Sequence, residues 1–136
     1  MPKVTISDIN GLVQQSGGGM TVNSRLYLGD GQTTTYSGND GNIPITAAYV
    51  KVDAGGSARS GLRFAGTGDA GQLIVVHNAG GEALTFEPGA TSLVRGLNGS
   101  NDTMEALGTY MFVSDGAFWC LIGGSEKTDQ DGMSAS

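Results

Sequence analysis

The residues of this 136-residue chain that could do chemistry are few and lie far apart in the sequence. His77 is the only histidine and Cys120 the only cysteine. Nucleophilic catalysis of the Ser-His-Asp type would have to use His77, which stands in the apolar run "QLIVVHN" and which we interpret as a structural or interface residue. One histidine and one cysteine cannot form a zinc site within a single chain, and we expect Cys120 to be a buried small hydrophobe. The sequence therefore predicts no catalytic residue, no metal ligand and no cofactor.

Two further motifs are explained by turns. The segment "GTGDAG" at residues 66–71 has the G-x-G-x-x-G spacing of a phosphate-binding loop, which needs a helix after it. A predicted strand follows here, so we interpret the motif as a plain turn. The segments "GDGQTTTYSGNDGN" and "NGSNDTME" carry Asp, Asn and Ser oxygens that could bind Ca²⁺, but they lack EF-hand spacing, and turn formation accounts for the same residues.

Composition and charge narrow the class of protein. The chain carries a net charge of −6, and its seven basic residues are spread from Lys3 to Lys127, which disfavours nucleic acid as a partner. A lone cysteine excludes an intrachain disulfide. No apolar run approaches the roughly 18 residues of a membrane helix, and "MPKVTISDIN" lacks the apolar core of a signal peptide, so we expect synthesis in a cytoplasm and no membrane partner.

The pattern of short strands and turns predicts an all-β domain. The chain has 24 glycines and only 15% charged residues, which favours turns and short strands over helical bundles. β-rich runs recur at roughly 8 to 12 residue spacing, which is typical of a small antiparallel β-sandwich or barrel of jelly-roll-like form. The predicted strands lie at 24–28, 32–38, 43–53, 61–66, 72–78 and 83–88, and the last two are expected to form a hairpin with "NAGGE" as its turn.

The expected organisation is one β domain between two tails. Residues 1–20 are predicted to be an extended arm with a Gly-rich joint, residues 21–124 the β domain, and residues 125–136 a disordered tail.

The segment "TYMFVSDGAFWCLIGG" at residues 109–124 predicts a hairpin with a type I′ turn at Asp115-Gly116. This turn would pair Val113 with Phe118 and Phe112 with Trp119. Alternation then places one apolar set on each face. The first set is Met111, Val113, Phe118, Cys120 and Ile122, and the second is Tyr110, Phe112, Trp119 and Leu121. One set needs the domain's own core, and the other needs a second sheet or neighbouring subunits; the pattern leaves open which set serves which purpose.

Residues 45–124 resemble a module of tailed-bacteriophage structural proteins. The elements that carry the resemblance are Gly71-Gln72, Val76 to Gly80, Thr85-Phe86, Tyr110 to Val113, Asp115-Gly116 and Trp119. Proteins with this module include head decoration and head-fibre proteins and parts of tail fibres. The resemblance implies a compact β domain that often sits on a three-fold axis.

The short chain favours one member of that group, a capsid decoration (cement) protein. The resemblance then implies a homotrimer on the outer capsid surface of the virion, made in the host bacterial cytoplasm, that binds the phage major capsid protein and stabilises the shell. We expect the arm to touch the capsid through Lys3, Val4, Ile6, Ile9 and Leu12. The alternative is a tail-fibre or head-fibre receptor-binding module of the same virion. A small enzyme that uses His77 and a lectin-like β domain are further rivals.

Overall fold

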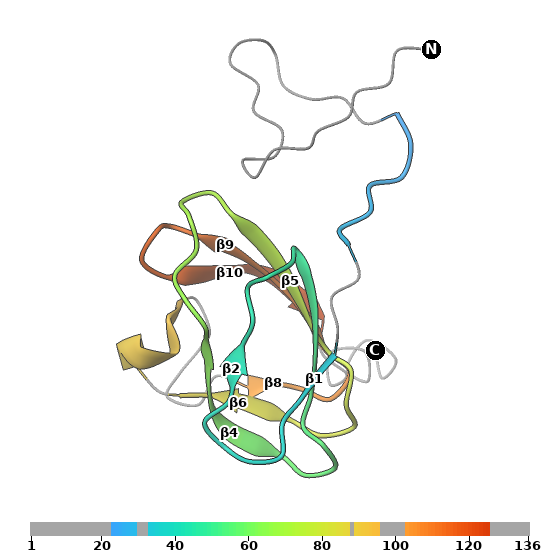
Figure 1. Cartoon of the computed structure of the whole chain (residues 1–136), viewed down its shortest axis with the longest axis vertical. Coiled ribbons are helices and arrows are strands. Elements are labelled where there is room, and N and C mark those ends of the chain that lie inside the picture. The colour runs from blue at the N-terminus through green and yellow to red at the C-terminus, as the bar shows by residue number, and fades with distance from the viewer. Residues whose placement is uncertain (1–22, 30–32, 88, 96–102, 126–136) are drawn as a thin grey trace, which may run out of the picture.

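The chain alternates strand by strand between two packed sheets (Figure 1). The computed structural model describes residues 23–29, 33–87, 89–95 and 103–125. The six-stranded sheet has the order β1 (Thr33–Thr35), β3 (Tyr49–Asp53), β5 (Leu73–Asn78), β9 (Thr109–Ser114), β10 (Trp119–Ser125) and β7 (Val94–Arg95). The four-stranded sheet has the order β2 (Asn42–Ile43), β4 (Arg59–Phe64), β6 (Leu84–Phe86) and β8 (Thr103–Met104).

The prediction of an all-β domain is confirmed. The only helical element in the described part of the chain is a four-residue 3₁₀ turn, η1 (Gly89–Ser92). Within those same ranges, no helix has the length and apolar character needed to cross a membrane.

The first six strands form a two-sided coil. β3 returns beside β1 and β5 beside β3, both in parallel, while β2, β4 and β6 repeat the pattern in the other sheet. Antiparallel pairs appear only later, where β9 lies between β5 and β10 and where β8 pairs with β6. The sheets are therefore mixed and not antiparallel throughout as predicted, because every connection up to β9 crosses to the opposite sheet.

The predicted hairpin of residues 72–88 is wrong for the same reason. β5 already has β3 on one side and β9 on the other, so β5 has no free edge with which β6 could pair. β6 instead crosses to the second sheet and pairs with β4 and β8. The loop between β5 and β6 is a passage between layers and not a hairpin turn.

The core between the layers is rich in aromatic rings. The ring of Phe64 in β4 lies 5.2 Å, centroid to centroid, from both Phe112 and Trp119 of the opposite sheet, and 5.9 Å from its neighbour Phe86. All four side chains are at most 2% exposed. Burial of each ring contributes roughly 2 to 3 kcal/mol, and the edge-to-face contact of Phe64 with Phe112 adds to this.

A buried amide fixes the passage after β5. The side-chain NH₂ of Asn78 donates to the carbonyl oxygens of Glu82 at 2.8 Å and Glu105 at 3.0 Å. Its Oδ1 accepts the Gly80 N–H at 3.2 Å. Asn78 is fully buried, so these bonds replace the water it has lost and join the end of β5 to two loops.

The C-terminal hairpin forms, but its predicted register is wrong by two residues. Val113 pairs with Cys120 and Ser114 with Trp119, which leaves a four-residue loop, 115–118, in place of the predicted two-residue turn. The cause is Asp115, whose Oδ1 accepts the N–H groups of Ala117 at 2.8 Å and Phe118 at 2.6 Å. The side chain thus caps a longer loop in which Gly116 has positive φ and Asp115 does not, so the turn is not type I′.

Other segments differ from expectation or lie outside the described residues. The predicted strand at 24–28 is absent, and residues 23–29 run as an extended trace beyond the two layers (Figure 1). The predicted arm, residues 1–20, and all of the predicted tail except Ser125 lie outside the described residues.

Candidate binding surface

The outer face of β5, β9 and β10 carries an apolar strip. We define the outer strip as Leu73, Val75, Met111, Val113, Cys120 and Ile122. The sheet register places Leu73 opposite Val113 and Val75 opposite Met111. Leu73 is 39% exposed, Met111 38% and Ile122 56%. These large apolar side chains therefore meet solvent although the core of the domain is already closed.

A β-bulge in β10 shapes the centre of this strip. Leu121 pairs with Phe112, but the next pair is Gly123 with Met111, so Ile122 is the extra residue. Gly123 has open space where a Cβ would lie. A shallow hollow of about 320 Å³ lies here, and the residues that line it are Val75, Thr109, Tyr110, Met111, Gly123 and Gly124. The strip thus has an exposed isoleucine directly beside a hollow.

Polar groups lie next to the outer strip on two sides. Beyond β10, the Arg95 guanidinium lies 3.7 Å from the ring centroid of Phe118. Hydrogen bonds from the backbone N–H groups of Ala117 and Phe118, followed by the charge of Arg95, hold the pKa of Asp115 below its ordinary value. At the opposite end of β5 and β9, His77 Nδ1 and Thr109 Oγ1 lie 2.8 Å apart.

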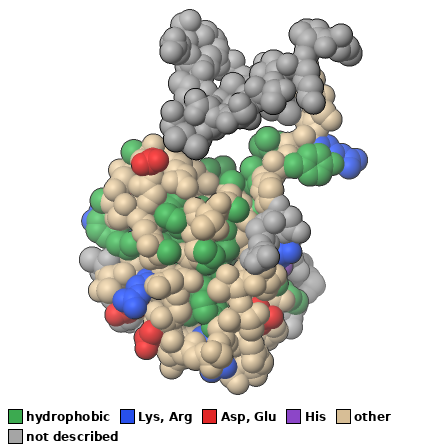
Figure 2. Space-filling view, viewed as in Figure 1, with side chains coloured by type: hydrophobic (Ala, Val, Ile, Leu, Met, Phe, Trp, Pro, Cys, Tyr) green, Lys and Arg blue, Asp and Glu red, His purple; other side chains and the backbone are tan. Residues whose placement is uncertain are grey.

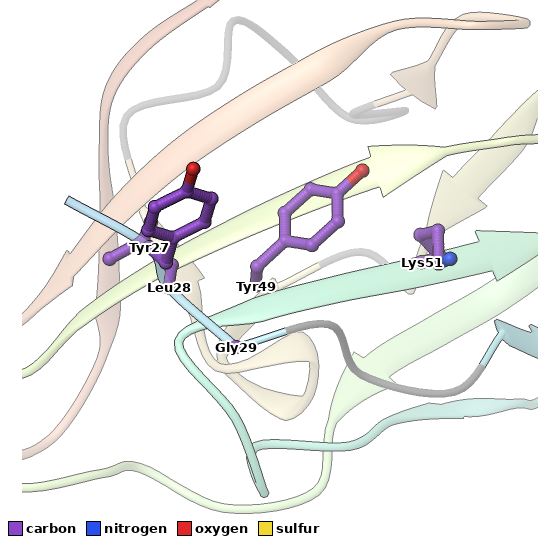
Figure 3. A pocket seen from close by; sticks show the side chains of 5 residues that line it. All are labelled: Tyr27, Leu28, Gly29, Tyr49 and Lys51. Carbon is purple, nitrogen blue, oxygen red and sulfur yellow. The ribbon is translucent and has the colours of Figure 1, made fainter. Parts of the chain in front are cut away.

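A second hollow, of about 430 Å³, lies on the same sheet near β3 (Figure 3). Tyr27, Leu28 and Gly29 line it from the extended segment, and Tyr49 and Lys51 line it from β3. Tyr27 is exposed and Tyr49 half-buried, so two tyrosine rings are available to a ligand at this hollow.

The structure separates the two predicted faces of the C-terminal hairpin. Tyr110, Phe112 and Trp119 are buried against the other sheet, and Leu121 is half-buried at the edge of the same core. This set is the core face, and its cover is the domain's own second sheet. The opposite set, with Met111 and Ile122, forms part of the outer strip. The arm residues Lys3, Val4, Ile6, Ile9 and Leu12 lie outside the described residues.

Cys120 is half-buried on the outer strip and not buried as predicted. The prediction failed because it took one apolar strand to mean burial on both faces, whereas the Cys120 face of β10 has no covering layer among the described residues. The Cys120 Sγ lies 4.0 Å from Asp115 Oδ2.

The described residues hold no cluster of metal-ligating side chains. Nowhere among them do three His, Cys, Asp or Glu side chains gather as metal ligands would. The segment 66–71 is a turn before β5, as predicted, closed by the Gln72 N–H donating to the Asp69 carbonyl oxygen at 2.9 Å. Figure 2 shows charged side chains scattered singly over the viewed face, without a basic patch there.

The chain matches no family model, and no curated protein matches it.

Sequence reasoning did not single out the outer strip as a surface. It noted the apolar face that includes Met111 and Ile122, but it left open which of the two hairpin faces belongs to the core and which meets a partner. The available signal was the Gly123-Gly124 pair after Ile122, because a glycine within a strand often marks a bulge or a close approach.

Proposed function

We propose that the chain is a capsid decoration protein of a tailed phage, which binds the outer surface of the head as an oligomer and stabilises the shell. The observation that carries the proposal is the outer strip, an exposed apolar surface on a small domain that already has a closed core. Large exposed apolar patches on soluble proteins are typical of protein–protein contact sites. The phage-like motif elements suggest that the particle is a phage virion, and the outer strip is the surface through which we propose that the chain assembles.

The motif residues act as fold determinants, which is consistent with a module reused in several virion proteins. Asn78 anchors the passage after β5, and Asp115 caps the last loop. Trp119 donates its indole N–H to the Gly66 carbonyl oxygen at 2.7 Å. Because these residues build the domain, the contacts that decide the partner must come from other surfaces.

In the proposed mechanism, a trimer bridges neighbouring capsid subunits across joints that the packaged DNA pushes apart. The arm, residues 1–20, lies on the shell, and three arms per trimer convert a weak contact into a strong one through valency. The net charge of −6 is compatible with both the bridging trimer and the bound arm, since the proposed partner is protein and not nucleic acid.

The copy number in purified particles tests this proposal. Quantitative mass spectrometry of virions of the phage that encodes this chain should find it in an amount comparable with the major capsid protein. A few copies per particle would favour a fibre, and its absence from particles would contradict a virion role.

A receptor-binding module on a head or tail fibre is the second candidate, and the hollow between Tyr27 and Tyr49 favours it. Exposed tyrosine rings can stack on sugar faces while their hydroxyl groups stay in water. Binding of the chain to surface glycans of the host bacterium, lost in Tyr49→Ala and kept in Leu73→Ala, would support this function. If the native chain does not bind these glycans, the receptor-binding function is contradicted.

A further inference from the structure

We propose that a second copy of this chain covers the outer strip, with Ile122 of one copy seated in the hollow above Gly123 of the next. This inference rests on the proposed function for its oligomer and names the surface that forms it.

The shape of the strip supports a self-contact. Ile122 is the most exposed side chain of the strip, and the hollow beside it exists because Gly123 opposite Met111 has no side chain. A projection and a matching hollow on one surface allow each subunit to be both donor and acceptor. The contact is heterologous: each subunit inserts its Ile122 into one neighbour and receives the Ile122 of another, which is the kind of contact that closes into a ring.

The charges favour a second copy over a different partner. Each chain carries a net charge of −6, so two copies repel each other wherever carboxylates face one another. The six side chains of the outer strip carry no charge. A partner selected by charge would need an ionic group on the strip, and the six side chains offer none; the cation Arg95 lies beyond β10, over the ring of Phe118.

Cys120 provides a second readout of the same contact. Its thiol is half-buried in the strip, two residues before Ile122 in the sequence, so a second copy on this surface shields it from reagents. Since the chain has no other cysteine, the rate of alkylation reports on this one position.

The test compares the full-length chain with Gly123→Thr at matched concentration, by light scattering after size exclusion and by the rate of Cys120 alkylation. Gly123 is exposed with room for a Cβ, so threonine fills the hollow without disturbing the fold, which thermal melting checks. The control is Gly81→Thr, in the loop after β5, because Gly81 is also exposed with open space at Cβ.

The expected result is a native mass of three chains of 13.8 kDa each, and a mass of one chain for Gly123→Thr, with faster alkylation of Cys120 and unchanged melting. Gly81→Thr should keep the native mass. Ile122→Ser, which removes the projecting side chain, should also be monomeric.

Two results would overturn the inference: a monomeric native chain, or a Gly123→Thr variant with the native mass and alkylation rate. If the chain is abundant in virions, either result leaves its role as a decoration protein standing, although a monomeric chain would remove the trimer from the proposed mechanism. An oligomer that depends on Gly123 but is absent from virions would contradict the proposed function and leave the inference standing.

Discussion

The indole N–H of Trp119 donates to the carbonyl oxygen of Gly66 at 2.7 Å, and the same ring lies against Gly68. The two glycines belong to the loop before β5, whereas Trp119 begins β10. This contact therefore joins the loop that precedes one central strand to the start of another, across 53 residues of chain. It explains why a glycine-rich loop stands beside the largest side chain of the core.

Replacement of Gly68 by alanine should destabilise the domain. A Cβ at Gly68 would lie 2.6 Å from Trp119 Cζ2, and the backbone has a φ of +67°. We expect a loss of roughly 3 kcal/mol in the free energy of unfolding, from overpacking and from left-handed strain together. Denaturant unfolding followed by Trp119 fluorescence measures it.

Gly71→Ala is the matched control, since Gly71 lies in the same loop with a φ of +87° and open space at its Cβ. This variant should lose only about 1 kcal/mol in the free energy of unfolding, from the left-handed backbone strain without the overpacking. Equal losses for the two variants would show that the contact with Trp119 does not matter.

Asn78→Ala should cost about 2 to 4 kcal/mol of stability, because it removes the buried amide that donates to the Glu82 and Glu105 carbonyl oxygens and leaves the buried Gly80 N–H without its acceptor. Asn78→Asp should cost more, since a carboxylate would face the same carbonyl oxygens. Chemical denaturation of each variant measures the loss.

Asn39→Ala serves as the control for Asn78. Asn39 is exposed, and its side chain accepts one hydrogen bond, from the Ser60 N–H at 3.1 Å. Its loss should stay below about 1 kcal/mol. If Asn78→Ala lowers the free energy of unfolding as little as Asn39→Ala does, the buried amide of Asn78 is not important for the stability of the fold.

Asp115 should make stability depend on pH at the acid end. Its pKa is lowered in the folded chain by the N–H groups of Ala117 and Phe118 and by Arg95. A lowered folded pKa means that the stabilisation is present above the unfolded pKa, about 3.9 for an aspartate, and is lost as pH falls through the folded value. Native chain should therefore melt higher than Asp115→Asn at neutral pH.

The difference in melting temperature between the native chain and Asp115→Asn should shrink toward zero as the pH falls below about 4. Other carboxylates titrate in both proteins and cancel in the comparison. A difference that stays constant down to the acid limit would contradict the assigned role of Asp115.

Deletion of residues 2–19 should weaken binding to capsids while leaving the β domain folded. The reason is that the described domain, residues 33–125, closes its core without them. Sedimentation of the chain with heads measures the binding, and melting of the free chain reports on folding. Unchanged affinity after the deletion would refute a capsid contact through the arm.

The sequence carried the local pattern of the fold well. Alternation in "QLIVVHN" predicts that Ile74 and Val76 share one face and that Leu73 and His77 share the other, and the structure shows that the face of Ile74 and Val76 is the buried one. It also predicted that Phe112 and Trp119 share a face, although the pairing in the hairpin was wrong. Faces follow from the period of two within a strand, and that period survives a register shift of two residues.

The alternation of apolar and polar residues could not predict which strands pair with one another. In the coil, Thr33 pairs with Lys51 and Val50 pairs with Val76. The number of residues between paired positions differs from one turn of the coil to the next, so the sequence shows no repeat of fixed length. The hairpin register depended on one side chain, Asp115, whose two hydrogen bonds to the loop backbone lengthen the turn. The outer strip emerged only from the sheet order, because sequence alone could not show which apolar face a second layer covers.

Binding of the purified chain to heads assembled without it is the most direct test of the account. The chain should saturate the heads at a fixed ratio to the major capsid protein and raise the temperature at which they release DNA. Failure to bind heads, or binding that leaves this temperature unchanged, would contradict a role in stabilising the shell.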